Sequence, residues 1–179
     1  TVGVLSSQQI RALIASSPPL IDGYLDLEEQ LQANGFDMTL DSLSTFAGAG
    51  RIGRTNADRV LAQTHDLAFD VRGEVVLAPG PYVARLTETV HLPQGIMALA
   101  KPRSSMLRNG VAVHNAVWDA GYKGRSQVQV VVYNPAGFTL AQGARIVQMV
   151  FMTLDSDTDN PYAGRYQGEA MQAGTEGSR

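Results

Sequence analysis

Two short stretches in the second half of the chain combine residue types that could act on a phosphorylated ligand. The first reads PRSSMLR over residues 102–108, and the second reads VWDAGYKG over residues 117–124. Arginine forks and small hydroxyl groups supply hydrogen-bond donors at several angles without adding bulk, as a polyphosphate requires. The first stretch therefore predicts a phosphate-binding set, whose candidate residues are Arg103, Ser104, Ser105 and Arg108.

The second stretch offers one carboxylate among small residues, followed by an aromatic side chain. Asp119 could take a proton from water or organise a metal-bound water. Tyr122 could pack against the face of a sugar. A purely structural alternative for the two stretches is a basic turn followed by a glycine-rich hairpin.

The two stretches resemble motifs of the dUTPase and dCTP deaminase superfamily. Its second motif is Pro-Arg-Ser-Ser/Gly, which residues 102–105 match. Its third motif is x-Asp-x-Gly/Asp-Tyr/Phe-x-Gly, which residues 119–124 match from the Asp onward. Either match alone would be weak, but both occur in order and at compatible spacing.

Two further segments resemble other motifs of the superfamily. Residues 32–43 are similar to the first motif, Pro/Ala-x-Gly-x-Asp-Leu, which implies that Asp37 helps to hold a magnesium–triphosphate complex through water. The alternative for Asp37 is a solvent-facing carboxylate on a half-buried strand. Residues 143–148 resemble the fourth motif, Gly-x-Arg-Ile-x-Gln, which implies a structural or site-facing Arg145 and a Gln148 that contacts phosphate or supports residues that do. The alternative for this pair is an ordinary edge strand.

The C-terminal segment resembles the signature of the deaminase branch, Tyr-x-Gly-Lys/Arg-Tyr-Gln, and departs from the glycine-rich fifth motif of trimeric eukaryote-type dUTPases. The resemblance implies a lid over the triphosphate, in which Arg165 touches phosphate and Tyr162 and Gln167 complete the closure. Residues 155–179 are polar and glycine-rich, so the segment is predicted to be mobile on its own. We therefore divide one domain into a β region with an N-terminal helix, residues 1–154, and a flexible lid, residues 155–179.

One position separates the two reactions that the superfamily performs. In dCTP deaminases, a glutamate ten residues after the third-motif Asp shuttles protons during metal-free deamination; here that position is Gln129. An amide cannot accept and return a proton at neutral pH, although it can hydrogen-bond to a pyrimidine. No Asp or Glu occurs from residue 120 to residue 154, so no neighbour in that strand can replace the glutamate. The base is expected to lie against residues 127–131, including Gln127, Val128 and Gln129, with Tyr122 on the deoxyribose.

The elements that must carry these residues are mostly strands. Short apolar runs, such as residues 74–77, 96–100 and 127–133, alternate with Pro/Gly turns, a pattern typical of all-β sandwiches and barrels. Residues 6–15 predict one helix, and residues 47–59 predict an exposed excursion. The resemblance implies the same class: a distorted jelly roll, or dUTPase-like β-barrel, assembled as a homotrimer with sites at the subunit interfaces.

Composition restricts the class of protein further. The 179 residues suit one domain, and the absence of cysteine excludes a disulfide framework or a cysteine-built zinc site, such as that of zinc-dependent deaminases. A net charge of −3 argues against a nucleic-acid partner, and no apolar run approaches a membrane span. The sequence has no signal-peptide pattern, and the expected compartment is the cytoplasm.

Residues 108–122 look most like the archaeal-type dUTPase group of the deaminase branch. The predicted function is hydrolysis of dUTP to dUMP and pyrophosphate with Mg²⁺, which the substrate phosphates hold together with Asp37 acting through water. Two alternatives stay open: a dCTP deaminase, alone or bifunctional, and a non-catalytic nucleotide sensor on the same scaffold. We expect His114 to pack rather than to reach the site.

Overall fold

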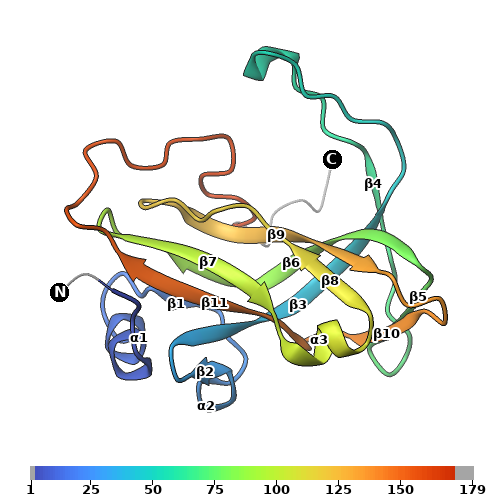
Figure 1. Ribbon diagram of the computed structural model, residues 1–179, viewed down its shortest axis with the longest axis horizontal. Helices are drawn as coiled ribbons and strands as arrows, with labels where there is room; N and C mark the ends of the chain where they lie inside the picture. The colour runs from blue at the N-terminus through green and yellow to red at the C-terminus, as the bar shows by residue number, and fades with distance from the viewer. Residues whose placement is uncertain (1–2, 172–179) are drawn as a thin grey trace, which may run out of the picture.

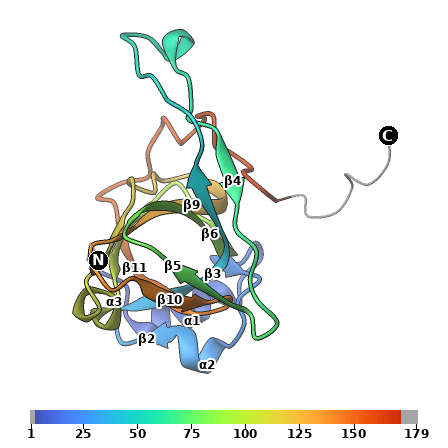
Figure 2. The same cartoon turned by 90° about the vertical axis from the view of Figure 1, so that its right-hand side faces the viewer.

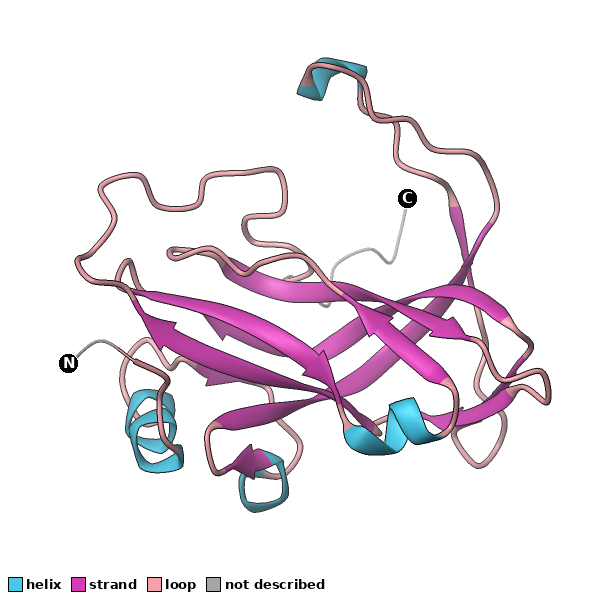
Figure 3. Ribbon diagram, viewed as in Figure 1, coloured by secondary structure: helices cyan, strands magenta, loops and turns pink. Residues whose placement is uncertain are grey.

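The computed structural model describes residues 3–171 and consists mainly of antiparallel strands (Figures 1 and 3). The helices are short: α1 (Ser7–Ile14), α2 (Leu27–Gln30), α3 (Ser104–Arg108) and the 3-10 turn η1 (Asn56–Asp58). The strands are β1 (Ile21–Asp22), β2 (Leu31–Gln32), β3 (Gly35–Phe46), β4 (Thr64–Asp66), β5 (Glu74–Leu77), β6 (Gly80–His91), β7 (Ile96–Pro102), β8 (Val111–His114), β9 (Lys123–Val132), β10 (Phe138–Ala141) and β11 (Arg145–Thr153). This composition confirms the all-β prediction.

The main sheet curls until its two ends nearly meet. Its strands follow the order β7-β11-β3-β6-β9-β8, and β5 and β10 form a separate pair. The β7 edge is bridged to the segment before β9, since Ala98 and Trp118 exchange two main-chain hydrogen bonds of 2.9 and 3.1 Å. Figure 2 shows the curl end-on. A nearly closed sheet leaves little unpaired edge and encloses one core.

Strict alternation along β6 and β9 separates the core from the outer surface. On β9 the side chains of Val128, Val130 and Val132 point inward and are buried, whereas those of Gln127 and Gln129 are exposed. The period of two follows from the pleat of a strand. The alternation places both glutamines of the predicted base site on the outer face of the sheet.

The predicted N-terminal helix is confirmed as α1. It begins after Ser6, whose amide donates to Gln9 Oε1 at 2.9 Å. Its apolar stripe faces the barrel, with Ile10 and Ile14 buried. Within residues 3–171, no helix is both long and apolar enough to cross a membrane.

The predicted excursion around residues 47–59 is also confirmed. It projects from the body of the protein and carries η1 near its tip (Figure 1). Arg51 and Val60 exchange main-chain hydrogen bonds of 2.7 and 2.9 Å, so its two arms are paired. Ile52 at the tip is 80% exposed.

The alternative of a solvent-facing Asp37 on a half-buried strand is wrong. Asp37 and Thr39 on β3 are 3% and 1% exposed, so this part of β3 is buried on both faces. The reason is that polar partners from β6, β11, α2 and the residue before α3 cover the face that would otherwise meet solvent. A buried polar group is tolerated when such partners satisfy it.

Candidate active site

Asp119 lines a cavity of about 510 Å³, a volume suited to a small-molecule ligand. Its walls come from the turn before β9, the start of β9, the base of the excursion and the C-terminal segment. The Asp119 side chain is exposed, so it is accessible to a ligand. Four residues of the predicted site share this cavity: Asp119, Tyr122, Gln127 and Tyr162.

The turn that carries Asp119 is fixed by its neighbours on both sides. Trp118 is buried, its main chain is paired with Ala98, and its indole Nε1 donates to Ser126 Oγ at 2.6 Å. The Asp119 carbonyl accepts from the Tyr122 amide at 3.1 Å. Gly121 adopts φ +88°, and a Cβ there would lie 2.7 Å from Pro161 Cβ, so only glycine fits. The carboxylate therefore projects from a rigid turn.

Tyr122 is 6% exposed and presents only part of its ring to the cavity. Its hydroxyl lies 3.1 Å from Ser126 Oγ, and its ring meets Tyr162 edge-on with centroids 5.5 Å apart. Burial raises the pKa of Tyr122, so its phenol stays protonated at neutral pH. The side chain is thus a fixed apolar wall.

The predicted base-binding strand forms a shallow depression that continues from the cavity. The two hollows share Val83, Ala116 and Gln127. Pairing of β8 with β9 ends at His114, opposite Gln129. The part of β9 that precedes Gln129 is therefore not covered by β8 on that edge. The Val128 side chain lies in the core, which leaves only its main chain for a ligand. His114, expected to pack, is instead exposed and lines this depression.

The predicted phosphate-binding set occupies a different part of the chain from Asp119. Arg103 precedes α3, which carries Ser104, Ser105 and Arg108 as exposed side chains. None of these four residues lines the Asp119 cavity. Ala98 lies opposite Trp118, and the extended chain from Ala98 to Arg103 spans about 16 Å. On one chain the two halves of the predicted site are therefore apart.

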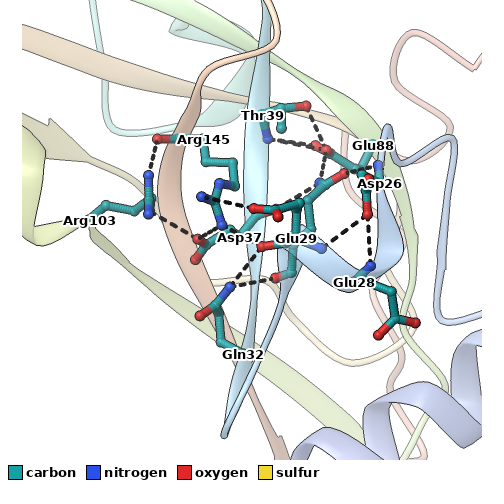
Figure 4. A network of polar contacts seen from close by, with 10 residues as sticks. Asp26, Glu28, Glu29, Gln32, Asp37, Thr39, Glu88, Arg103 and Arg145 are labelled. Atoms are coloured by element: carbon teal, nitrogen blue, oxygen red, sulfur yellow. Dashed lines mark hydrogen bonds and ion pairs between the residues drawn. The ribbon is translucent and has the colours of Figure 1, made fainter.

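Asp37 is held by two guanidinium groups (Figure 4). Its Oδ2 lies 2.9 Å from Arg103 Nε and 3.5 Å from Arg145 Nη1, and Arg145 also donates to the main-chain carbonyl of Glu29. Burial raises the pKa of Asp37, and the two arginines oppose that shift. Asp37 thus orients Arg103, a contact different from the water-mediated metal contact expected from the sequence.

A second buried carboxylate, Glu88, was not predicted from the sequence. It is fully buried and accepts hydrogen bonds from Thr39 Oγ1 at 2.7 Å, Thr39 N at 3.0 Å and Gln30 Nε2 at 2.6 Å (Figure 4). Gln30 Nε2 also donates to the Asp37 carbonyl at 2.8 Å. The available signal was an acid at an inward position of β6, between Leu86 and Val90.

Gln148 lies beside Asp37, its register partner on β3. A Cβ on Gly35 would lie 2.7 Å from Gln148 Nε2, so the amide passes directly over that glycine. Like Arg103, Gln148 is outside the Asp119 cavity. It therefore belongs to the Asp37 side of the predicted site.

The C-terminal segment packs against its own chain at the start of β9. Gln167 Oε1 accepts from the Lys123 amide at 2.8 Å, and Gln167 Nε2 donates to the Gly121 carbonyl at 3.0 Å. Gln167 therefore anchors the segment, while Arg165 is exposed. Residues 172–179 of the predicted lid lie outside the described residues.

Several residues that line the Asp119 cavity were not predicted from the sequence. They come from the strand ends at the base of the excursion and from the C-terminal segment, where no periodic pattern points to a site; they include Phe46, Leu61, Thr64, Tyr166 and Glu169. Only the folded chain brings these segments to β9.

The curled antiparallel sheet, the cavity at the start of β9 and the Arg103–Arg108 segment that carries α3 define the class of protein. Residues 4–154 match the model of the dCTP deaminase-like family, and the chain belongs to that family. A solved structure, the 2′-deoxycytidine 5′-triphosphate deaminase of Agrobacterium tumefaciens, is 25% identical with a TM-score of 0.66. That match covers 86% of this chain and 48% of the deaminase chain, so this chain spans about half of its length.

Within the family, the chain is similar to archaeal proteins over nearly its whole length. It is 43% identical to a probable deoxyuridine 5′-triphosphate nucleotidohydrolase of Methanosarcina mazei, over 94% of this chain and 98% of the relative. It is 47% identical to the protein of the same name in Archaeoglobus fulgidus, over 96% of this chain and 100% of the relative. The predicted family and its archaeal dUTPase branch are confirmed.

Proposed function

We propose that the protein is a dUTP diphosphatase, which hydrolyses dUTP to dUMP and pyrophosphate. The observation that carries the proposal is an exposed Asp119 in a nucleotide-sized cavity, next to a strand that has Gln129 where deamination would need an acid. The names of the archaeal relatives support the same substrate.

In this mechanism, Asp119 orients or deprotonates the water that attacks the α-phosphate in line. A positioned general base contributes roughly 10²- to 10⁴-fold to a rate. The main chain near Gln127 and the wall formed by Tyr122 hold the base and the deoxyribose against the outer face of β9. The pyrophosphate leaving group is stabilised by the arginine and serine donors of the predicted phosphate-binding set, called here the Arg103 set: Arg103, Ser104, Ser105 and Arg108.

Magnesium would neutralise part of the negative charge of the triphosphate. Within residues 3–171, no group of three His, Asp or Glu side chains could bind a metal by itself. This donor set fits an ion that is held mainly by substrate oxygens, to which Asp119 adds one accessible carboxylate. We assign Asp37 chiefly to the orientation of Arg103, because two guanidinium groups already contact its carboxylate.

We further propose that complete sites form between the subunits of a homotrimer. Asp119 and the Arg103 set do not share a cavity on one chain, so a second chain would bring the missing half. Leu99 and Leu107, which flank Arg103 in sequence, are 42% and 58% exposed and offer apolar surface for such an interface. The C-terminal segment would act as a lid, in which Tyr162 lines the cavity and Arg165 is free to meet phosphate.

One observation favours deamination as the second candidate: Glu169 places another carboxylate in the Asp119 cavity. The deciding experiment incubates the protein with each deoxynucleoside triphosphate and Mg²⁺, and measures pyrophosphate and ammonia separately. Pyrophosphate from dUTP without ammonia from dCTP is expected. Ammonia release from dCTP would favour the deaminase, and tight dUTP binding without pyrophosphate would favour a nucleotide sensor.

A further inference from the structure

Glu169 occupies a fixed position at the edge of the cavity. Its carbonyl accepts from the Arg125 amide at 2.8 Å, and its amide donates to the Tyr166 carbonyl at 3.1 Å. It also forms a parallel bridge to Gly124, where a Cβ would lie only 3.0 Å from Glu169 N. In Figure 1 the C-terminal segment returns to the side of β9. The main chain of Glu169 is thus docked on the strand that carries Gln127.

Glu169 is half-buried and lines the cavity, where its charge adds to the raised pKa of the neighbouring Tyr122. Among residues 3–171, no side chain or amide makes a hydrogen bond or ion pair with the Glu169 carboxylate. Burial raises the pKa of Glu169, and the charge of Arg85 on β6 opposes this shift. A carboxylate that lines a cavity and accepts no hydrogen bond from the protein keeps its acceptor sites available to a ligand.

The edges of the two candidate bases differ in the atom that such an acceptor would meet. Uracil has an N3–H donor between two carbonyl oxygens, whereas the N3 of cytosine is an acceptor. An ionised carboxylate only accepts hydrogen bonds, and the Gln127 amide can both donate and accept. A carboxylate at N3 therefore attracts uracil and repels the lone pair of cytosine.

We propose that Glu169 is a specificity-determining residue, which accepts the N3–H of uracil and so excludes cytosine from the Asp119 cavity. The inference deepens the proposed function and rests on it. Glu169 would thereby couple docking of the C-terminal segment to recognition of the base. If the segment were undocked, Glu169 could not form a hydrogen bond with the base.

The test compares the wild type with Glu169→Gln, which keeps the shape of the side chain but adds a donor. The ratio of kcat/KM for pyrophosphate release from dUTP and from dCTP is expected to fall about 10- to 100-fold, mainly through a loss with dUTP. Asp157→Asn is the matched control, because Asp157 is an exposed acid of the same segment that does not line the cavity. Its ratio is expected to equal that of the wild type.

Calorimetric binding of dUMP and dCMP gives a second readout that does not need turnover. Glu169→Gln should weaken dUMP binding and lower the ratio of the affinity for dUMP to the affinity for dCMP. Equal losses for both nucleotides would assign the carboxylate to the shared sugar and overturn the proposal, as would an unchanged ratio. If the wild type releases no pyrophosphate from dUTP, the proposed function fails, and the binding ratio still decides the role of Glu169.

Discussion

At the scale of single residues, Asp119 is the side chain on which the proposed reaction depends. Replacing it with asparagine keeps its size and removes its basicity. We expect kcat for dUTP to fall by roughly 10²- to 10⁴-fold, because the water loses its general base. Binding of dUMP should change little, because the base and the sugar contact other residues.

Steady-state pyrophosphate release and calorimetry would measure these two effects. Asp155→Asn serves as the control, since Asp155 is exposed and outside the cavity. A near-normal kcat for Asp119→Asn would remove Asp119 from the chemical step.

Thr39 offers a residue-scale test of the buried polar network. Thr39→Val removes the hydroxyl that donates to Glu88 at 2.7 Å. A hydrogen bond to a charged group contributes about 2 kcal/mol, so unfolding free energy at neutral pH should drop by about that amount. Because threonine and valine have similar shapes, the packing around residue 39 stays comparable.

The loss caused by Thr39→Val should depend on pH with a defined sign. Burial raises the folded-state pKa of Glu88 above its ordinary value, and losing the hydroxyl raises that pKa further. The full loss is therefore present above the folded-state pKa of the variant. The loss shrinks as the pH falls from that pKa to the lower folded-state pKa of the wild type, because a protonated Glu88 needs the donor less, and it stays constant at lower pH.

Denaturant unfolding between about pH 5 and pH 8 would measure the effect. Thr45→Val, on the same strand, is the control, since the Thr45 hydroxyl donates to an uncharged acceptor, the main-chain carbonyl of His65, at 3.4 Å. A loss from Thr39→Val that is the same at every pH would show that Glu88 does not titrate as argued.

At the scale of elements, the start of β9 and the C-terminal segment depend on Gly124. A Cβ at this position would lie 2.7 Å from Tyr122 Oη and 3.0 Å from Glu169 N. Gly124→Ala should therefore displace the segment and lower stability by about 1–3 kcal/mol through overpacking. The variant should also bind dUTP more weakly, since Tyr162 and Glu169 leave the cavity with the segment.

Hydrogen exchange provides the measurement. The amides of Gly168 and Arg125, which bond to the carbonyls of Lys123 and Glu169, should lose protection in Gly124→Ala. Gly48→Ala is the control, since a Cβ there meets only ordinary contacts near 3.8 Å. Full protection of both amides in Gly124→Ala would mean that the segment docks in another way.

At the scale of the whole molecule, the separation of Asp119 from the Arg103 set predicts complementation between inactive subunits. Asp119→Asn and Arg103→Ala chains should each be inactive alone. When refolded together in equal amounts as random trimers, about a quarter of the sites would combine an intact Asp119 with an intact Arg103. Pyrophosphate release should recover to that level.

Light scattering should give a mass three times the 19.2 kDa of one chain. Arg108→Ala is a second partner for the mixing experiment, because Arg108 is exposed and its loss leaves Asp37 paired. No recovery with either partner would place both halves of the site on one subunit, and an active monomer would refute the trimer.

The sequence by itself determined the family and the all-β class, and it supplied the candidate residues of the proposed site. The motifs around Arg103 and Asp119 are contiguous, and strand alternation has a period of two, so short stretches of sequence carry both signals. The strand predicted over residues 127–133 is present as β9, and the folded chain has Gln127 and Gln129 on its outer face.

Only the tertiary structure decided which of these residues meet. Asp37 and Arg145 are 108 residues apart, Gln30 and Glu88 are 58 apart, and Lys123 and Gln167 are 44 apart. Sheet closure and strand register set these contacts, and no local pattern encodes them. For this reason the sequence could not predict the two arginines that contact Asp37. Curling of the sheet buries Asp37 between them and brings Glu169 to the cavity of Asp119.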